Sequence, residues 1–367
     1  MRSRTVAVVA YVAAALAAPL SVELVSSSPA VAATGAPTDN PSPLVRIAGS
    51  HWIMDAPTKV AAAEGYFNVP GHEEPRVEAS YHASGRDALA ALLRGEAEYA
   101  LVAPTPVARA LLDHLDYPDQ NPAIVVLASL GISSASHYII ARRDRGIQQK
   151  ADLKGKRLGL LKKSSAHFSW NLTERLYGLE EGSVILVDLP VQEQAVALSA
   201  GDVDAVLSWD PYASRLRTSL DQQAVVFVDR AVASPNWLLV SRLTEVQGRP
   251  RVAERIVDAY RRAIQLVEAD PPRAAQLVKT QLPTGSGAPD LTSTGLFWNL
   301  ALDWAVVSNL EEQMRWWRRL DGVEGQPPAV PASYVWAGPL RAVAPESVVL
   351  PESLLRHPHA AKQSVRQ

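Results

Sequence analysis

Two stretches, LRGEAEYALVAPTPVAR (93–109) and SAGDVDAVLSWDPYASR (199–215), follow one plan at a constant offset of 106 positions. In each, a glycine (Gly95, Gly201) ends a helix-like run, an acidic turn follows, and an apolar strand-like run leads to a proline. Glycine closes helices because it adopts the left-handed conformation at little cost. Proline suits the first turn of a new helix. Two such units predict two lobes of similar plan, and they are weak evidence for duplication.

Strand-like and helix-like runs alternate on both sides of these stretches. Around the first stretch the expected strands are 44–49, 76–80 and 98–103, and the expected helices are 54–67 and 85–95. Around the second stretch the expected strands are 156–161, 183–188 and 203–208, and the expected helices are 164–178 and 191–201. The repeated β-α-β-α-β order predicts an α/β fold in which each lobe is a mostly parallel sheet flanked by helices.

The remainder of the chain is predicted to be mainly helical. Apolar residues recur at helical spacing in 249–269, 271–282 and 291–320, and the last run is long enough that we expect a break in it. Four tryptophans of the last run are expected to pack on helix faces: Trp298, Trp304, Trp316 and Trp317. The Pro-rich segment from 321 onward is expected to wrap the surface.

The N-terminus has the features of a cleaved secretory signal. Arg2 and Arg4 precede an apolar run (6–20), and small residues follow at 29–33. Pro19 and Glu23 interrupt the run short of the roughly 20 apolar residues that a membrane span needs. We therefore expect a signal peptide over 1–33 with cleavage near Ala33, a flexible leader over 34–43, and a mature chain that is exported without insertion in the membrane.

Composition excludes several classes of function. The 36 basic and 38 acidic residues are balanced and form no basic stripe, which argues against nucleic-acid binding. The absence of cysteine removes disulfides, thiol nucleophiles and thiolate metal sites. The sequence contains no Gly-x-Ser-x-Gly elbow and no His-x-x-x-His pair. We therefore expect no catalytic residues, no metal and no cofactor.

The turn LKKSSAHFSW (161–170) lies between an expected strand and an expected helix. In parallel sheets ligands bind beyond the carboxyl ends of the strands. A helix start presents unpaired N–H groups and a positive dipole end, which suit an anion. Ser164 or Ser165 could also do no more than cap the helix. Both interpretations remain open from the residues alone.

Several stretches resemble the solute-binding proteins of ATP-driven importers for nitrate, taurine and alkanesulfonates. They are AAAEGYF (61–67), SGRDALAALLRGEAEYALVAPTP (84–106), ADLKGKRLGLLKKSSAH (151–167), VALSAGDVDAVLSWDPY (196–212) and SPNWLLVSR (234–242). The resemblance implies a type II periplasmic binding protein fold with the ligand cleft between two lobes. It implies one lobe over 44–133 plus 237–335, a second over 138–232, and a surface tail over 336–367.

The resemblance also implies the ligand-facing positions. They are Ser50, His51, Trp52, Ser84, Gly85, Pro104, Thr105, Ser164, Ser165, Ala166, His167, Trp209 and Asp210. His51 and His167 could each donate to an oxyanion or pack structurally, and Trp209 could wall an apolar tail. Asp210 could cap the next helix or contact an amine.

The implied function is that of a periplasmic, monomeric binding protein without enzymatic activity. Its ligand would be a small oxyanion, an aliphatic sulfonate first, with taurine or nitrate as alternatives. Its partners would be the membrane permease and ATPase of an ABC importer. An enzyme or sensor on the same fold, related to a desulfinase or to a pyrimidine-forming thiamin enzyme, is the alternative.

Overall fold

The computed structural model describes residues 44–68, 75–135, 137–228, 236–283, 289–292, 295–323 and 334–355. The predicted signal peptide and leader, and residues 356–367 of the predicted tail, lie outside the described residues. Among the helices that are described, none combines the length and the apolar character that crossing a membrane requires.

The first sheet has six strands in the order β11-β4-β10-β3-β1-β2. Its strands are β1 (Leu44–Ser50), β2 (Arg76–His82), β3 (Tyr99–Val102), β4 (Ile124–Ser133), β10 (Asn236–Arg242) and β11 (Leu296–Ala301). β1 pairs in parallel with β2 and β3, whereas β10 pairs antiparallel with both β3 and β4. β1 to β4 therefore run one way, and β10 and β11 run the other.

The second sheet has five strands in the order β7-β6-β8-β5-β9. Its strands are β5 (Tyr138–Arg142), β6 (Arg157–Leu160), β7 (Ile185–Asp188), β8 (Ala205–Ser208) and β9 (Ala224–Val228). β6 pairs in parallel with β7 and β8, and β5 pairs antiparallel with β8 and β9. The predicted mostly parallel character holds for strand direction in both sheets, with β10, β11 and β5 as the reversed strands.

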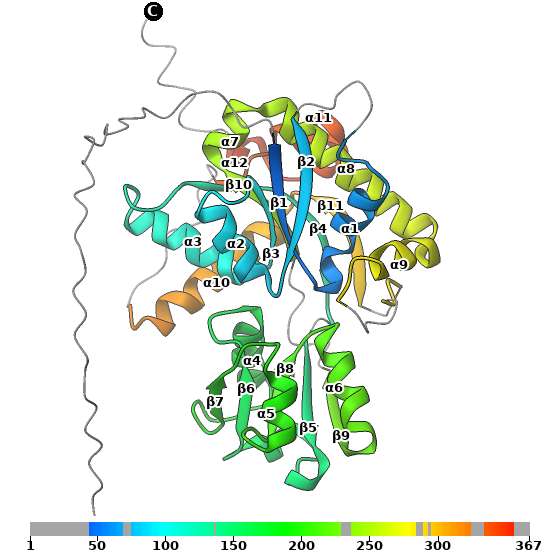
Figure 1. Ribbon diagram of the computed structural model, residues 1–367. Coiled ribbons are helices and arrows are strands. Elements are labelled where there is room, and N and C mark those ends of the chain that lie inside the picture. Colours follow the sequence, from blue (N-terminus) through cyan, green and yellow to red (C-terminus); the bar gives the residue numbers. More distant parts are fainter. Residues whose placement is uncertain are drawn as a thin grey trace, which may run out of the picture. The chain divides into compact units, whose positions relative to one another are not determined.

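Helices cover both sheets (Figure 1). With the first sheet go α1 (Ala56–Ala63), α2 (Gly85–Leu93), α3 (Pro104–Asp116), α7 (Leu243–Gly248), α8 (Pro250–Ala269), α9 (Pro271–Lys279), α10 (Trp304–Leu320), α11 (Gly338–Val343) and α12 (Glu352–Leu355). With the second sheet go α4 (Ser165–Leu176), α5 (Gln194–Ala200) and α6 (Tyr212–Leu220). We call each sheet with its helices the six-stranded half and the five-stranded half.

The core follows from the sequence pattern. Strands buried on both faces read as continuous apolar runs, and all four residues of β3 and of β8 are buried. α8 buries one face, which carries Ile256, Tyr260 and Ala263 at helical spacing. The predicted α/β class with two helix-flanked sheets is confirmed.

The same clamp closes the amino ends of the parallel strands in both halves. Arg46 donates to Glu98 from its backbone N–H (2.7 Å) and from its guanidinium (3.1 Å). Arg157 donates to Asp204 in the same two ways, at 2.9 Å and 3.1 Å. Glu98 and Asp204 are 106 positions apart, which is the offset between the two repeated stretches. The stretches therefore correspond in their contacts as well as in their residue types.

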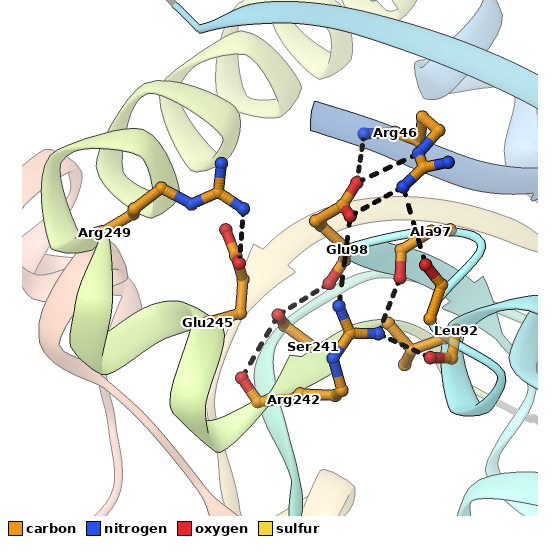
Figure 2. A network of polar contacts seen from close by, with 9 residues as sticks. Arg46, Leu92, Ala97, Glu98, Ser241, Arg242, Glu245 and Arg249 are labelled. Atoms are coloured by element: carbon orange, nitrogen blue, oxygen red, sulfur yellow. Dashed lines mark hydrogen bonds and ion pairs between the residues drawn. The ribbon is translucent and has the colours of Figure 1, made fainter. Parts of the chain in front are cut away.

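An arginine from the reversed strand completes each clamp. Arg242, at the end of β10, donates to the carbonyl of Leu92 at 2.5 Å and lies 4.0 Å from Glu98 (Figure 2). Arg142, at the end of β5, donates to the carbonyl of Leu198 at 3.1 Å. Leu92 and Leu198 again differ by 106 positions. The reversed strand thus occupies the same place in both halves.

The structure corrects one helix. The run 291–320 was expected to be a broken helix, but residues 296–301 form β11 on the edge of the first sheet. Trp298 therefore stands on a strand, and Trp304 is exposed at the start of α10 rather than packed. Trp316 and Trp317 do pack inside, as expected. Helical spacing misled here because β11 is an edge strand whose pairing with β4 leaves no sequence signal of its own.

The described part of the expected tail contributes to the core. Val335 bridges to Val126 of β4, and α11 packs against α8. Leu340 and Leu350 are buried. Residues 336–355 therefore do more than cover the surface.

Candidate ligand-binding site

A small cavity of about 20 Å³ lies where the two halves meet, beyond the carboxyl ends of the parallel strands. Its lining comes from both halves: Trp52, Ser84, Gly85, Arg86, Ala103, Pro106, Ser164, Ser165, Trp209 and Trp237. A space of this size holds about one water molecule. We call it the central cavity.

Two helix starts from opposite halves border the central cavity. Ser84 caps α2 by accepting from Asp87 N (3.2 Å), and Ser164 caps α4 by accepting from Ala166 N (3.2 Å). Each cap uses one N–H of its helix, and the remaining N–H groups of the first turn have no partner inside the helix. The positive ends of both helix dipoles therefore face the same small space.

The start of α3 also reaches the central cavity but offers fewer donors. Pro104 and Pro106 lack an N–H, so Thr105 supplies the first-turn donor between them. The Thr105 hydroxyl donates to Gln313, and its carbonyl accepts from Trp317 Nε1 at 2.8 Å. This residue is committed to the packing of α3 against α10.

Aromatic side chains form the apolar wall. The Trp52 and Trp237 rings meet edge to face with centroids 4.6 Å apart. His137 lies between Trp52 (5.8 Å) and Trp209 (6.2 Å) and contacts Ser165 Oγ through Nε2 at 3.2 Å. Burial lowers the pKa of His137 to about 4, so the ring is neutral at pH 7. The wall therefore carries no charge.

Arg86 is the cation among the described residues that line the central cavity. It follows the α2 cap, and its guanidinium donates to the carbonyl of Lys162 in the other half at 3.1 Å. The lysines of the 161–170 turn do not take this place. The Lys162 backbone N–H donates to Asp188 at 2.9 Å, and Lys163 is exposed with a positive φ of 60°.

A buried ion pair holds the loop that carries Trp52. Lys59 Nζ donates to the carbonyl of Ser50 at 2.5 Å, and Asp55 accepts from the N–H of Ser50 at 2.5 Å. The two charged groups are 3.7 Å apart and fully buried. Burial raises the pKa of Asp55 and lowers that of Lys59, and each partner's charge opposes the shift. Glycine is required at position 49, because a Cβ there would lie 2.2 Å from Asp55 Oδ2.

Two larger cavities flank the central one. A cavity of about 440 Å³ is bordered by His51, Tyr212 and Arg215 among others. A second, of about 460 Å³, shares Ser165 with the central cavity and is bordered by His137. We call the latter the side cavity.

The structure brings most of the sequence-predicted residues to these spaces. Trp52, Ser84, Gly85, Ser164, Ser165 and Trp209 line the central cavity, His51 lines the 440 Å³ cavity, and Thr105 lines the side cavity. Burial, helped by the charges of Lys59 and Arg215, lowers the pKa of His51 to about 4. That ring too is neutral at pH 7.

The other predicted residues line none of these cavities, because they are buried in the packing or contact other parts of the protein. Ser50, Pro104 and Ala166 are buried in the packing. The His167 ring packs on Trp316 with centroids 5.1 Å apart, and burial lowers its pKa to about 4. Asp210 accepts from the N–H of Ser214 in the first turn of α6 at 2.9 Å, a contact of the capping kind, although the cap position itself is Pro211.

Several lining residues were missed from the sequence, and three of them carry aromatic or charged groups: Trp237, Arg86 and His137. Trp237 lies in the quoted stretch 234–242, yet its place beside Trp52 depends on the antiparallel pairing of β10 with β3. Arg86 adjoins the predicted pair Ser84 and Gly85, so adjacency was an available signal. His137 was expected in a structural role, and only the tertiary structure places it against Ser165. Among the described residues, no group of three or more His, Asp or Glu side chains gathers to hold a metal ion.

Comparison with known proteins gives a family and a fold. A family model described as NMT1/THI5 like matches residues 54–274. No curated protein is a significant match. The alkanesulfonate-binding protein SsuA from Xanthomonas axonopodis pv. citri, bound to MOPS, is similar at 18% identity over 81% of this chain and 99% of that one, with a TM-score of 0.64.

Two further solved structures share the fold. The ligand-binding component of an ABC-type import system from Staphylococcus aureus, with zinc bound, is 12% identical over 82% of this chain and 99% of that one (TM-score 0.66). The desulfurization enzyme DszB is 16% identical over 83% and 99% (TM-score 0.58). The fold is that of periplasmic binding proteins, as the sequence resemblance implies.

Proposed function

The chain belongs to the NMT1/THI5-like family, and on that premise we propose that it is an exported solute-binding protein of an ABC importer whose ligand is an organosulfonate. The observation that carries the proposal is the meeting of two capped helix starts, those of α2 and α4, around a cavity walled by three indoles. Helix starts suit an anion, and indole faces suit the apolar part of an organic one.

The charge of the site favours a permanent anion over a titrating one. His51, His137 and His167 are neutral at pH 7, so positive potential comes from the helix dipoles and Arg86. A sulfonate stays ionised throughout this range and presents three acceptor oxygens. We place its head at the start of α4, where Ser165 borders both the central and the side cavity.

The central cavity is smaller than a sulfonate group, so its walls move apart when the ligand enters. The chain passes between the two sheets twice, from β4 to β5 and from β9 to β10, and a hinge motion of one half against the other would open the site. Closure would then present both halves to a permease and its ATPase. Taurine and nitrate remain alternative ligands, and the indole wall favours a ligand with an apolar part over nitrate.

The signal peptide predicted from the sequence of residues 1–33 supports export to the periplasm. Solved structures of the same fold include an SsuA bound to MOPS, a sulfonate, and a component of an import system. These likenesses support a solute-binding protein, and the proposal takes it to be a monomer that returns its ligand unchanged.

Ligand binding by residues 34–367 tests this proposal, and it is detected by thermal unfolding and by tryptophan fluorescence. A panel of alkanesulfonates, taurine, nitrate and sulfate is compared, and a ligand at 100 times its Kd raises the unfolding free energy by about 2.7 kcal/mol. Ser165→Asp should weaken sulfonate binding at least about 100-fold by like-charge repulsion, and Ser165→Ala by less than about tenfold. Ser219→Asp, an exposed serine of α6, is the matched control and should bind like the wild type.

The fold shared with DszB makes an enzyme the second candidate. Incubating the chain with each bound sulfonate and measuring released sulfite separates the two functions. Unchanged ligand supports the binding protein, and sulfite release would replace it with a desulfurization enzyme. If no compound of the panel stabilises the protein, the sulfonate proposal is wrong.

A further inference from the structure

A relay of three amides, two of them buried and one half-buried, runs along the floor of the side cavity. Gln313 accepts from the Thr105 hydroxyl and donates through Nε2 to Asn309 Oδ1 at 2.5 Å. Asn309 Nδ2 donates to Asn236 Oδ1 at 3.0 Å, and Asn236 Nδ2 donates to Ser129 Oγ at 3.2 Å. The relay joins α3, α10, β10 and β4. Its direction is set at Ser129, whose hydroxyl donates to the carbonyl of Gly131 (3.3 Å) and therefore accepts from Asn236.

The relay leaves part of each amide's capacity for a ligand. A carboxamide has two N–H donors and a carbonyl with two acceptor sites. Within the described residues, Gln313, Asn309 and Asn236 each use one donor and one acceptor site in the relay. All three border the side cavity, and Gln313 and Asn236 are 1% and 2% exposed. Each amide therefore keeps one N–H donor and one acceptor site that the relay does not use.

The floor of the side cavity is polar but uncharged. His137 is neutral at pH 7, and the other uncharged polar groups at the cavity are the three amides and the hydroxyls of Thr105, Ser165 and Ser308. Apolar side chains complete the lining: Ile132, Phe168, Leu172 and Ala305. The charged residues Glu312 and Arg315 border the same cavity but are exposed, at its rim. A plain alkyl chain placed here would cover amides without pairing them, which is unfavourable.

We propose that the side cavity holds an uncharged functional group of the ligand that both donates and accepts hydrogen bonds, as a carboxamide does. This inference rests on the proposed function, because it takes the sulfonate head to lie at Ser165, which the two cavities share. It selects amide-bearing sulfonates over the plain alkanesulfonates within the proposed class.

The experiment compares two ligands of equal chain length, N-acetyltaurine and 1-pentanesulfonate, by isothermal titration calorimetry on residues 34–367. The first carries an amide where the second carries two methylenes. N-acetyltaurine should bind at least about tenfold more tightly, because a buried hydrogen-bonding site discriminates strongly against an analogue that leaves it unpaired. Asn309→Leu should reduce the preference to less than about threefold, with little effect on 1-pentanesulfonate.

The ratio of the two dissociation constants is the decisive readout, since a merely structural role of Asn309 would change both equally. Asn299→Leu, at an exposed position of β11, is the matched control and should keep the wild-type ratio. The wild-type comparison decides the matter even if Asn309→Leu unfolds. Equal affinities, or a preference for 1-pentanesulfonate, would overturn this inference and leave the sulfonate site standing. Binding of neither compound would overturn both proposals.

Discussion

The serines of the 161–170 turn show how one residue pair serves two purposes. Ser164 caps α4, while Ser165 borders both cavities and contacts His137. The capping interpretation drawn from the sequence therefore holds for Ser164, and ligand contact by Ser165 remains a proposal. Adjacent side chains at a helix start point in different directions, so the two interpretations do not exclude one another.

His137 makes the stability of the protein sensitive to acid. Its pKa is lowered to about 4 by burial, against about 6.5 in an unfolded chain. Below about pH 6.5 the imidazole binds a proton in the unfolded state but stays unprotonated in the folded state. The free energy of unfolding therefore decreases as the pH falls from about 6.5 towards 4. This group alone should reduce the free energy of unfolding by about 2 kcal/mol between about pH 7.5 and pH 5.

Urea unfolding of the wild type and of His137→Asn at these two pH values measures that contribution. The variant should lose about 2 kcal/mol less than the wild type on acidification. Equal losses would show that the imidazole titrates in the folded state as it does in the unfolded one.

At the scale of elements, the arginine–carboxylate clamps explain why the two sequence units match. Glu98 precedes β3 and Asp204 precedes β8, and each accepts from the first strand of its half. The clamps lie at the amino ends of the strands, away from the candidate site. They therefore serve stability, whereas the opposite ends of the same strands carry the ligand-facing loops.

Removing either carboxylate should destabilise the protein by a similar amount. Glu98→Ala and Asp204→Ala each leave partly buried arginine and backbone groups without their acceptor, which costs about 2 kcal/mol. Urea unfolding measures both, and Glu96→Ala, at an exposed position two residues before Glu98, should unfold like the wild type. A large effect for one clamp with no effect for the other would contradict their equivalence.

At the scale of the whole molecule, few polar contacts near the central cavity join the two halves, and the one from Arg86 to the Lys162 carbonyl borders the proposed anion position. Arg86 thus combines two roles in the proposal, attraction of the anion and a link that forms when the halves meet. A residue with both roles affects ligand binding more than the stability of the unliganded chain.

Arg86→Met should weaken sulfonate binding about tenfold, since hydrogen bonds to charged groups contribute about 1.5 kcal/mol or more. Its unfolding temperature without ligand should stay near that of the wild type. Calorimetric titration and thermal melts measure the two effects, with Arg94→Met, near the end of the same helix, as control. If Arg86→Met instead lowers the unfolding temperature of the unliganded protein clearly, along with the affinity, Arg86 has a structural role.

The parallel strands and their helices could be predicted from the sequence because each is encoded locally. Gly95 and Gly201, both with positive φ, end the preceding helical runs, and Ser84 and Ser164 begin helices as caps do. β11 could not be predicted, because the apolar residues of this edge strand do not follow a spacing that distinguishes a strand from a helix. Burial of residues 336–355 likewise depends on a partner, α8, that lies far away in the chain.

The α/β class, the repeated plan and the loops at which a ligand could bind can be predicted from the residues, because helix stops, caps and apolar strands are local properties. Which side chains face one another depends on the folded chain. Trp237 meets Trp52 through strand pairing, His137 just before β5 meets Ser165 at the start of α4, and the amides of β10 and α10 join into one relay. These contacts link residues distant in sequence, and no local pattern encodes them, because pairing and packing select the partner only when the chain has folded.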